Sequence, residues 1–413
     1  MTRDPAQHAV ALPAHRSALE PWRQTVRGGT REDRTLAEIT VSLPPHIADL
    51  APAIPSSVAA ASDDALRKIA TLDATEGHHL ASLSTLLVRA ESVASSKIER
   101  IEASVDEFAR ALHGNRSNPA ATSMVASASA LIELVDSVNS GGVNGGGSLT
   151  VGSLHRAHAL LMADDPREVT FAGRPRNMQN WIDGSDHSPR GAVYIPPPAR
   201  TLASYLDDLV AFANRNDIGV LTQAAIVHAQ FESIHAYTDG NGRIGRALIN
   251  TILRRRGVTR RVVIPLASAI VARRQDYFDA LDSYRAGDVG PLLASFARGA
   301  AIAAEEAGTT ARRLAEMPSQ WRSAAMNPRG GSAASALIDT LLDDPVFTAE
   351  DVEGRLERPS SSAYAAISRL HDAGVIRPLT QRAARRQVWV TCALSDELDD
   401  LGVRIATRAR AET

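Results

Sequence analysis

The chain of 413 residues contains a single cysteine, Cys392, so it cannot form a disulfide bond within itself. Aromatic residues make up only 4% of the sequence, and 45 Lys and Arg nearly balance 47 Asp and Glu. This balance gives no overall basic character of the kind that attracts nucleic acid. No run of about 18 apolar residues and no signal-peptide pattern is present. These absences predict a cytoplasmic protein without a membrane partner.

The most informative stretch of the sequence runs from His235 to Arg246 and reads His-Ala-Tyr-Thr-Asp-Gly-Asn-Gly-Arg-Ile-Gly-Arg. Apolar residues before and after it recur at helical spacing, and the second helix is expected to end in a basic turn followed by Gly257. The glycine turn would therefore lie at a helix N-terminus. Free backbone N–H groups and the helix dipole make that position favourable for an anion.

Arg243 and Arg246 lie three residues apart and so share one side of the second helix. Cations in the first turn oppose the helix dipole, at a cost of a few tenths of a kcal/mol or more each. A polyphosphate bound between them and the glycine turn would remove this cost, whereas an ordinary solvated helix–loop–helix would not. Asp239 could hold a magnesium ion that bridges phosphates. His235 could accept a proton from a hydroxyl group.

The stretch resembles the motif of the Fic family, His-x-Phe-x-Asp/Glu-Gly-Asn-Gly-Arg-x-x-Arg, with Tyr237 replacing the usual Phe and Ala236 a frequent Pro. Fic proteins are mostly helical nucleotidyltransferases, and they usually transfer AMP from ATP to a Ser, Thr or Tyr hydroxyl of a target protein. The resemblance implies ATP as substrate, a magnesium ion at Asp239 and His235 as the catalytic base. The implied phosphate-binding residues are Gly240, Asn241, Gly242, Arg243 and Arg246.

A second segment, Ser95-Ser-Lys-Ile-Glu99-Arg100, resembles the inhibitory segment of Fic proteins, Ser/Thr-x-x-x-Glu-Gly/Asn. Ser95 and Glu99 match that pattern, and Arg100 departs from it. A glutamate presented to Arg246 would form a forked ion pair and occupy the cation that the γ-phosphate of ATP needs. In isolation the segment would be interpreted as a surface helix with a solvated Glu99. Beside the first motif it predicts autoinhibition.

Residues 180–198, which begin with Asn-Trp-Ile and end with three prolines, resemble the flap of Fic proteins. In that family the flap is a hairpin over the active site, and it pairs with the backbone of the target by strand addition. The strand expected to bind the target comprises Ala192, Val193, Tyr194 and Ile195. Tyr277 and Phe278 resemble an aromatic pair near the adenine, and a role in the core is an equal alternative for each.

The expected fold is mainly α, a Fic-type helical core with a small β-hairpin flap and a C-terminal winged helix-turn-helix. The winged helix is expected from three helical patterns followed by two strands and a basic turn. The expected parts are a flexible N-terminus (1–35), an N-terminal helical region with the inhibitory segment (36–115), the Fic catalytic core (116–310), a linker (311–333), the winged helix (334–395) and a C-terminal tail (396–413).

The main alternative function is that of a DNA-binding regulator, which does not exclude catalysis. The basic turn could contact DNA phosphates through Arg382, Arg385 and Arg386. Base edges could be reached from Ser362, Tyr364, Ser368 and Arg369. Such modules also bind proteins. The sequence leaves open the target protein, self-modification and a homodimer.

Other enzyme classes also remain as alternatives. Some Fic proteins transfer UMP, phosphate or phosphocholine, or remove AMP. His228, Glu232 and His235 fall on one helix face, as in carboxylate-bridged di-iron proteins. However, the further glutamates that such a centre needs on facing helices are not evident in the sequence.

Overall fold

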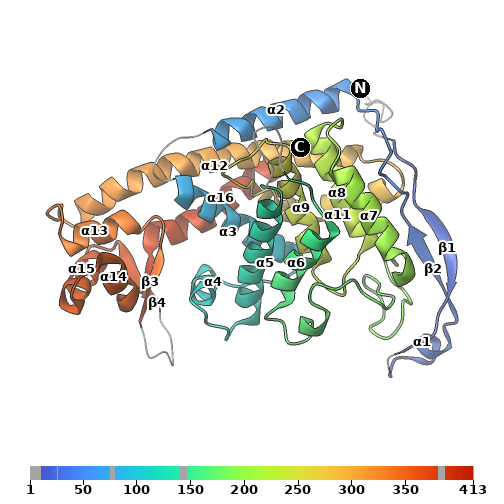
Figure 1. Ribbon diagram of the computed structural model, residues 1–413, viewed down its shortest axis with the longest axis horizontal. Helices are drawn as coiled ribbons and strands as arrows, with labels where there is room; N and C mark the ends of the chain where they lie inside the picture. Colours follow the sequence, from blue (N-terminus) through green and yellow to red (C-terminus); the bar gives the residue numbers. More distant parts are fainter. Residues whose placement is uncertain (1–10, 26, 75–79, 140–146, 380–386, 413) are drawn as a thin grey trace. The chain divides into compact units, whose positions relative to one another are not determined.

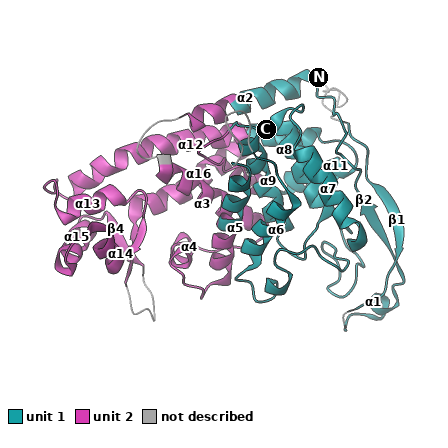
Figure 2. Ribbon diagram, viewed as in Figure 1, with its two compact units in different colours: residues 1–66, 129–258, 273–298 teal, residues 67–128, 259–272, 299–413 magenta. Residues whose placement is uncertain are grey.

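The structure is a computed structural model that describes residues 11–25, 27–74, 80–139, 147–379 and 387–412. The chain forms two compact units (Figure 2). Unit 1 comprises residues 1–66, 129–258 and 273–298, and unit 2 comprises residues 67–128, 259–272 and 299–413. Helices predominate in both units (Figure 1), as the mainly α prediction requires. Three helices run across the unit boundaries in sequence: α2 (Ser56–Asp73), α5 (Pro119–Ser137) and α12 (Gly290–Ala324).

Unit 1 is built around two helices that are consecutive in the sequence and run antiparallel, α8 (Val220–Ile234) and α9 (Asn241–Arg255). Residues 221–234 of α8 are all buried, which makes this helix the centre of the unit. Gly245 lets α9 approach it closely, because a Cβ atom there would lie 2.9 Å from Glu232 Oε1. The surrounding elements are α6 (Val151–Met162), η2 (Val169–Phe171), η3 (Ala199–Thr201), α7 (Leu202–Ala213) and α11 (Arg274–Arg285).

The N-terminal part of unit 1 is an antiparallel hairpin of β1 (Arg16–Pro21) and β2 (Glu38–Leu43), with the short helix α1 (Arg31–Thr35) between the strands. A capping box begins α1, because Thr30 and Asp33 exchange side-chain and backbone hydrogen bonds. The prediction that residues 1–35 are flexible is therefore wrong for β1 and α1. β1 pairs with β2, which follows later in the chain and leaves no local periodic signal, and α1 is held by its capping box and by a hydrogen bond from Ser188 to Asp33.

Unit 2 contains the long helix α3 (Leu80–Ile98), the helices α4 (Val105–Leu112) and α10 (Ala267–Ala272), and a C-terminal module of residues 333–391. The module consists of α13 (Ala333–Thr340), β3 (Val346–Thr348), α14 (Ala349–Leu356), α15 (Ser360–Asp372), β4 (Ile376–Leu379) and β5 (Val388–Thr391). Its strands form an antiparallel sheet in the order β3–β5–β4. The chain then continues into α16 (Cys392–Ala411).

The predicted linker is wrong in its first part, because α12 remains helical as far as Ala324 and includes Pro318. Proline inside a helix removes one hydrogen bond and disfavours the structure locally. The helix continues because Leu314, Met317 and Trp321 form a buried apolar stripe at spacings of three and four residues. Packing within unit 2 thus outweighs the local preference of the proline.

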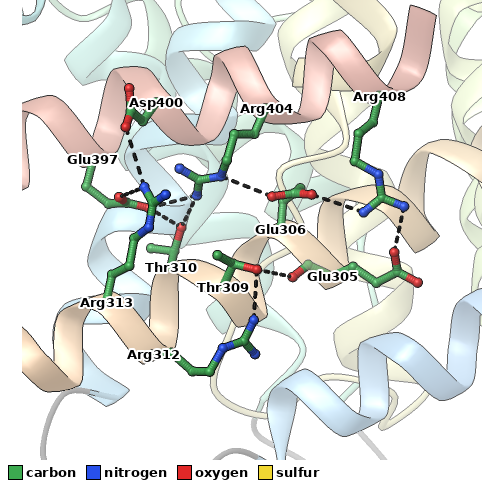
Figure 3. Close-up of polar contacts among 10 residues, drawn as sticks. All are labelled: Glu305, Glu306, Thr309, Thr310, Arg312, Arg313, Glu397, Asp400, Arg404 and Arg408. Carbon is green, nitrogen blue, oxygen red and sulfur yellow. Dashed lines mark hydrogen bonds and ion pairs between the residues drawn. The ribbon is translucent and has the colours of Figure 1, made fainter. Parts of the chain in front are cut away.

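The predicted C-terminal tail is also wrong, since these residues form most of α16, which binds α12 through a network of ion pairs (Figure 3). Glu397 on α16 is buried and accepts hydrogen bonds from Thr310, Arg313 and Arg404, at 2.5, 2.7 and 2.8 Å. Burial alone would raise the pKa of Glu397, but these hydrogen bonds outweigh it and hold that pKa below its usual range. Further along, Arg408 binds both Glu305 and Glu306 of α12.

Candidate functional site

The turn that joins α8 to α9 brings the predicted base and the glycine turn together in unit 1. His235 ends α8 in the left-handed conformation, with φ 49° and ψ 58°. Gly240 begins α9 in the same region, with φ 74°. Two left-handed residues five positions apart reverse the chain sharply, and for a non-glycine residue this conformation costs about 1–2 kcal/mol. Strain of this kind is often found at functional sites.

Gly240 is required at its position for two physical reasons. Its positive φ disfavours other residues, and a Cβ atom there would lie 2.5 Å from Met162 Cε and 2.7 Å from Leu161 Cδ2 on α6. Its N–H donates to Asp239 Oδ1 at 2.5 Å, which closes the turn. The next N–H groups belong to the first turn of α9 and have no acceptor within that helix. The N-terminus of α9 is thus suited to an anion, as the sequence predicts.

Asn241 has a structural role that the sequence did not predict. Its side chain is buried, accepts from the Tyr237 N–H at 2.9 Å and donates to the Tyr237 carbonyl at 2.9 Å. Asn180, at the start of the flap, donates to the same carbonyl at 3.0 Å. Both polar groups of the Asn241 side chain therefore hold the loop. A phosphate contact by Asn241 remains a prediction, and it would be made by the backbone N–H.

Tyr237 anchors the middle of the loop in the core of unit 1. Its ring stacks on that of His158, with centroids 3.8 Å apart and planes 4° from parallel, and its hydroxyl contacts His155 Nδ1 at 2.9 Å. His158 Nδ1 accepts from the Gly173 N–H, so Nε2 carries the proton and donates to the Asp239 carbonyl at 3.1 Å. Burial lowers the pKa of His158 to about 4, which keeps this bridge neutral at physiological pH.

The charged residues of the motif differ in their exposure. The Asp239 carboxylate is 56% exposed, whereas the Arg243 side chain is only 4% exposed and lies 3.5 Å from it. Arg246 is buried as well. Asp239 is therefore the accessible carboxylate of the turn. Magnesium ions are commonly bound by one carboxylate together with substrate phosphates, and Asp239 could serve as that carboxylate.

The alternative of a di-iron site receives no support from the described part of the chain. Within it, no group of three or more His, Cys, Asp or Glu side chains is arranged to hold a metal ion. His228 Nε2 instead contacts the Tyr277 hydroxyl at 2.9 Å in the core of unit 1. Tyr277 is itself buried, and its ring lies 5.2 Å from that of Phe278. A position for Tyr277 beside an adenine remains a prediction.

The predicted inhibitory segment forms the C-terminal end of α3 in unit 2. The Ile101 N–H bonds the Ser96 carbonyl at 3.1 Å, and the Arg100 N–H bonds the Lys97 carbonyl at 3.0 Å. This pattern is a Schellman motif, and Arg100 occupies its left-handed position with φ 60°. Gly and Asn are the residues that adopt this conformation most easily. Arg100 thus takes up the backbone conformation that the Gly/Asn of the resembling pattern would favour, directly after Glu99.

The predicted flap strand forms a minimal hairpin with residues 180–182. Ile182 pairs with Tyr194, with hydrogen bonds of 2.9 Å from the Ile182 N–H and from the Val193 N–H. Val193 is largely exposed, whereas the hydroxyl of Tyr194 donates to the Ser233 carbonyl in the core. The carbonyl of Ile195 accepts from the Ser42 N–H at the end of β2. The N-terminal hairpin thus already bonds one position of the strand expected to receive a target.

The structure describes only some of the residues that are predicted to contact DNA. Arg382, Arg385 and Arg386 lie outside the described residues. Arg369, which was expected to face bases, instead donates to the Ala325 carbonyl at 2.9 and 2.7 Å, where it binds the end of α12. A cation at a helix C-terminus is favoured by the helix dipole, which accounts for this position.

The comparisons with known proteins agree with the geometry of the turn. Residues 148–253 match the Fic/DOC family. The matched segment contains α6, the flap, α7, α8 and almost all of α9. It therefore includes every motif residue from His235 to Arg246.

Among curated proteins, 100 residues are 33% identical to a probable protein adenylyltransferase of Aquifex aeolicus (strain VF5), over 24% of this chain and 29% of that protein. A stretch of 172 residues is 30% identical to the protein adenylyltransferase Fic of Nematostella vectensis, over 41% of this chain and 36% of that protein. The chain thus matches about a third of the length of these relatives.

Among solved structures, a Fic family protein from Desulfovibrio desulfuricans G20 has a similar fold. The TM-score is 0.50 at 19% sequence identity, over 82% of this chain and 97% of that one. This likeness supports the mainly α, Fic-type fold. No helix in the described ranges is both long and apolar enough to cross a membrane.

Three residues that contact the backbone of the motif were not singled out as site residues from the sequence. Asn180 and His158 bond the carbonyls of Tyr237 and Asp239, and Arg176 bonds that of His235. A weak signal for Arg176 exists, since it lies in the Gly-, Pro- and Asn-rich stretch that leads to the flap. Nothing local to these residues indicates which carbonyls they bind.

Proposed function

We propose that this protein is a protein adenylyltransferase, which transfers AMP from ATP to a Ser, Thr or Tyr hydroxyl of a target protein or of itself. The observation that carries the proposal is the single turn between α8 and α9. It presents His235, an accessible Asp239 and the N-terminus of α9 together, in a segment that matches the Fic/DOC family. The adenylyltransferase names of the two relatives support the choice of ATP.

In the proposed reaction His235 accepts the proton of the target hydroxyl. The hydroxyl oxygen then bonds to the α-phosphorus of ATP, the bond from that phosphorus to the bridging oxygen breaks, and pyrophosphate leaves. The N-terminus of α9, Arg243 and Arg246 would stabilise the charge on the phosphates. A magnesium ion held by Asp239 would neutralise part of the charge of the leaving group.

The test is intact-mass measurement of the purified chain after incubation with ATP and magnesium. A gain of one AMP unit, absent in His235→Ala, is expected. A gain of one phosphate would indicate phosphoryl transfer, and AMP released from a previously modified protein would indicate the reverse activity. Full modification of His235→Ala would contradict the assignment of the base.

Autoinhibition by Glu99 is a further part of the proposal. Its support is the match of Ser95 and Glu99 to the inhibitory pattern and the Schellman turn at Arg100. If the Glu99 carboxylate competes with the γ-phosphate for Arg246, Glu99→Gly should increase the turnover of automodification more than the affinity for ATP. Arg246→Ala should cancel this gain in the double variant. Equal turnover in the wild type and in Glu99→Gly would exclude the inhibitory role.

DNA binding by the C-terminal module is the second candidate function. Three helices combined with a small antiparallel sheet favour it, and Tyr364 on α15 is 60% exposed. A gel-shift titration of duplex DNA at low salt tests it. Joint replacement of Arg382, Arg385 and Arg386 by Ala should reduce the salt slope by about one unit per lost phosphate contact. No binding by the wild type would favour a protein partner.

A further inference from the structure

Arg176 connects three backbone positions of unit 1 through one buried guanidinium group. Its Nε donates to the His235 carbonyl at 2.8 Å, its Nη1 to the Met178 carbonyl at 2.9 Å and its Nη2 to the Pro197 carbonyl at 2.6 Å. Its backbone N–H also donates to the Ala236 carbonyl at 2.9 Å. The side chain therefore holds both the predicted base and the two ends of the flap.

The electrostatics of this contact are unusual for a buried arginine. The residue is 2% exposed, and no acidic side chain in the described ranges forms an ion pair with it. Burial lowers the pKa of Arg176 to about 10, so the group stays charged at neutral pH. Its charge is balanced by carbonyl dipoles, including that of His235 at the C-terminal end of α8, where the helix dipole favours a cation.

The three carbonyls belong to different parts of the proposed site. Met178 precedes the flap hairpin and Pro197 follows it, while His235 is the proposed base. The planar guanidinium has its N–H groups in a rigid fork, so it sets the spacing of all three carbonyls at once. Gln179 adds a second link across the base of the flap, because its amide donates to the Pro196 carbonyl at 2.8 Å.

We propose that Arg176 is a positioning residue that holds the flap in register with His235, so that a hydroxyl presented along the flap arrives at the base. The inference rests on the proposed adenylyltransferase function. It assigns to Arg176 the alignment of the target, whereas the turn between α8 and α9 binds ATP. Loss of this alignment should therefore reduce transfer while ATP binding persists, because a misplacement of about 1 Å can reduce a rate about 100-fold.

The test compares Arg176→Lys and Arg176→Met with the wild type. Lysine keeps the charge and can donate to some of these carbonyls, but it lacks the planar fork that spans all three. We expect Arg176→Lys to retain most of the thermal stability and to bind ATP within about twofold of the wild type. Its turnover for AMP transfer should fall about 10- to 100-fold. Arg176→Met should lose stability as well, since three carbonyls lose their donors.

Arg255 offers a matched control in the same unit, at the opposite end of α9. It is also buried, and it donates to the carbonyls of Arg215 and Asn214. Arg255→Lys should lower stability slightly and leave the turnover unchanged. Deuterium uptake of residues 179–196 should rise in Arg176→Lys and not in Arg255→Lys.

Three outcomes would overturn the proposal. Arg176→Lys could transfer AMP at the wild-type rate, or its ATP binding and turnover could fall in the same proportion. Deuterium uptake of the flap could also stay at the wild-type level in Arg176→Lys. If neither the wild type nor Glu99→Gly transfers AMP, the proposed function itself fails. In that case the deuterium uptake of the flap still shows whether Arg176 holds this segment.

Discussion

At the scale of single residues, left-handed backbone conformations mark the positions on which the proposed chemistry depends. His235 and Gly240 flank the turn between α8 and α9, and Arg100 follows Glu99 at the end of α3. Each conformation reverses or ends a helix, and only at Gly240 does a glycine relieve the strain. Substitutions at these positions therefore distinguish two contributions to stability: the strain of the left-handed backbone and the contacts of the side chain.

Gly240→Ala should reduce stability by about 1–2 kcal/mol, because alanine is strained at this φ and its Cβ would displace Leu161 and Met162. AMP transfer should fall by at least about tenfold, since the N-terminus of α9 would shift. Gly257→Ala is the control, because φ is 71° there and no atom lies within 4 Å of the added Cβ. Urea denaturation and automodification measure both effects. Equal AMP transfer by Gly240→Ala and Gly257→Ala would show that the close packing of Gly240 against α6 is not needed for activity.

Arg100→Gly should stabilise the protein by about 0.5–1 kcal/mol. Glycine removes the left-handed strain at the Schellman position, and its greater freedom in the unfolded chain offsets part of the gain. Arg100→Ala keeps the strain and should show no gain. Urea denaturation of both variants measures the difference, and a loss of stability in Arg100→Gly would mean that the arginine side chain contributes more than the strain costs.

At the scale of elements, α1 attaches the N-terminal hairpin to the flap. Ser188 donates to the buried Asp33 carboxylate at 2.6 Å, Trp22 packs edge-to-face on Trp181 with centroids 5.6 Å apart, and Ser42 bonds the carbonyl of Ile195. These contacts come from segments about 150 residues apart. They explain why the expected flap strand is preformed, with the end of β2 already beside it.

Asp33→Asn should detach α1 from the flap. The side chains of Arg31 and Arg34 are already exposed, so loss of the ordered helix should make the chain easier for trypsin to cleave after them. Hydrogen bonds from Ser188, Thr30 and Ser185 hold the pKa of Asp33 far below its usual range. A carboxylate with a lowered pKa in the folded state stabilises the protein above its unfolded pKa of about 3.9, and the effect is lost as the pH falls through the lower folded value.

Limited proteolysis followed by mass spectrometry tests this attachment at neutral pH. Glu38→Gln is the control, because Glu38 is exposed on β2. Equal cleavage of Asp33→Asn and Glu38→Gln would show that the carboxylate is not needed to hold α1. In the wild type, the attachment should persist below pH 4.

At the scale of the whole molecule, the buried His158 and the half-buried His15 predict how stability depends on pH. Burial lowers the pKa of His15 and of His158 to about 4. Between pH 4 and the unfolded value of about 6.5 the unfolded chain binds more protons than the folded one. Stability should therefore rise with pH through this window, by up to about 1.4 kcal/mol per pH unit for each histidine.

Thermal unfolding at pH 4.5, 5.5 and 6.5 tests this dependence. His15→Gln should reduce the slope, because it removes one of the two groups. A melting temperature of the wild type that is constant between pH 4.5 and 6.5 would contradict the prediction.

The sequence by itself determined the features that depend on neighbours along the chain. The helical periodicity of α8 and α9, the turn from His235 to Gly240 and the basic end of α9 at Gly257 all follow from local spacing and from the conformational preferences of glycine. For the same reason the motif could be related to the Fic family before any contact was known.

Only the tertiary structure decided which distant groups meet. Arg176 lies 59 residues from His235, and Asp33 lies 155 residues from Ser188. Their hydrogen bonds depend on how helices and hairpins pack, and no periodic pattern records this. Packing also kept Pro318 within α12 and ordered the N-terminal hairpin, because burial of apolar side chains and strand pairing outweigh weak local preferences.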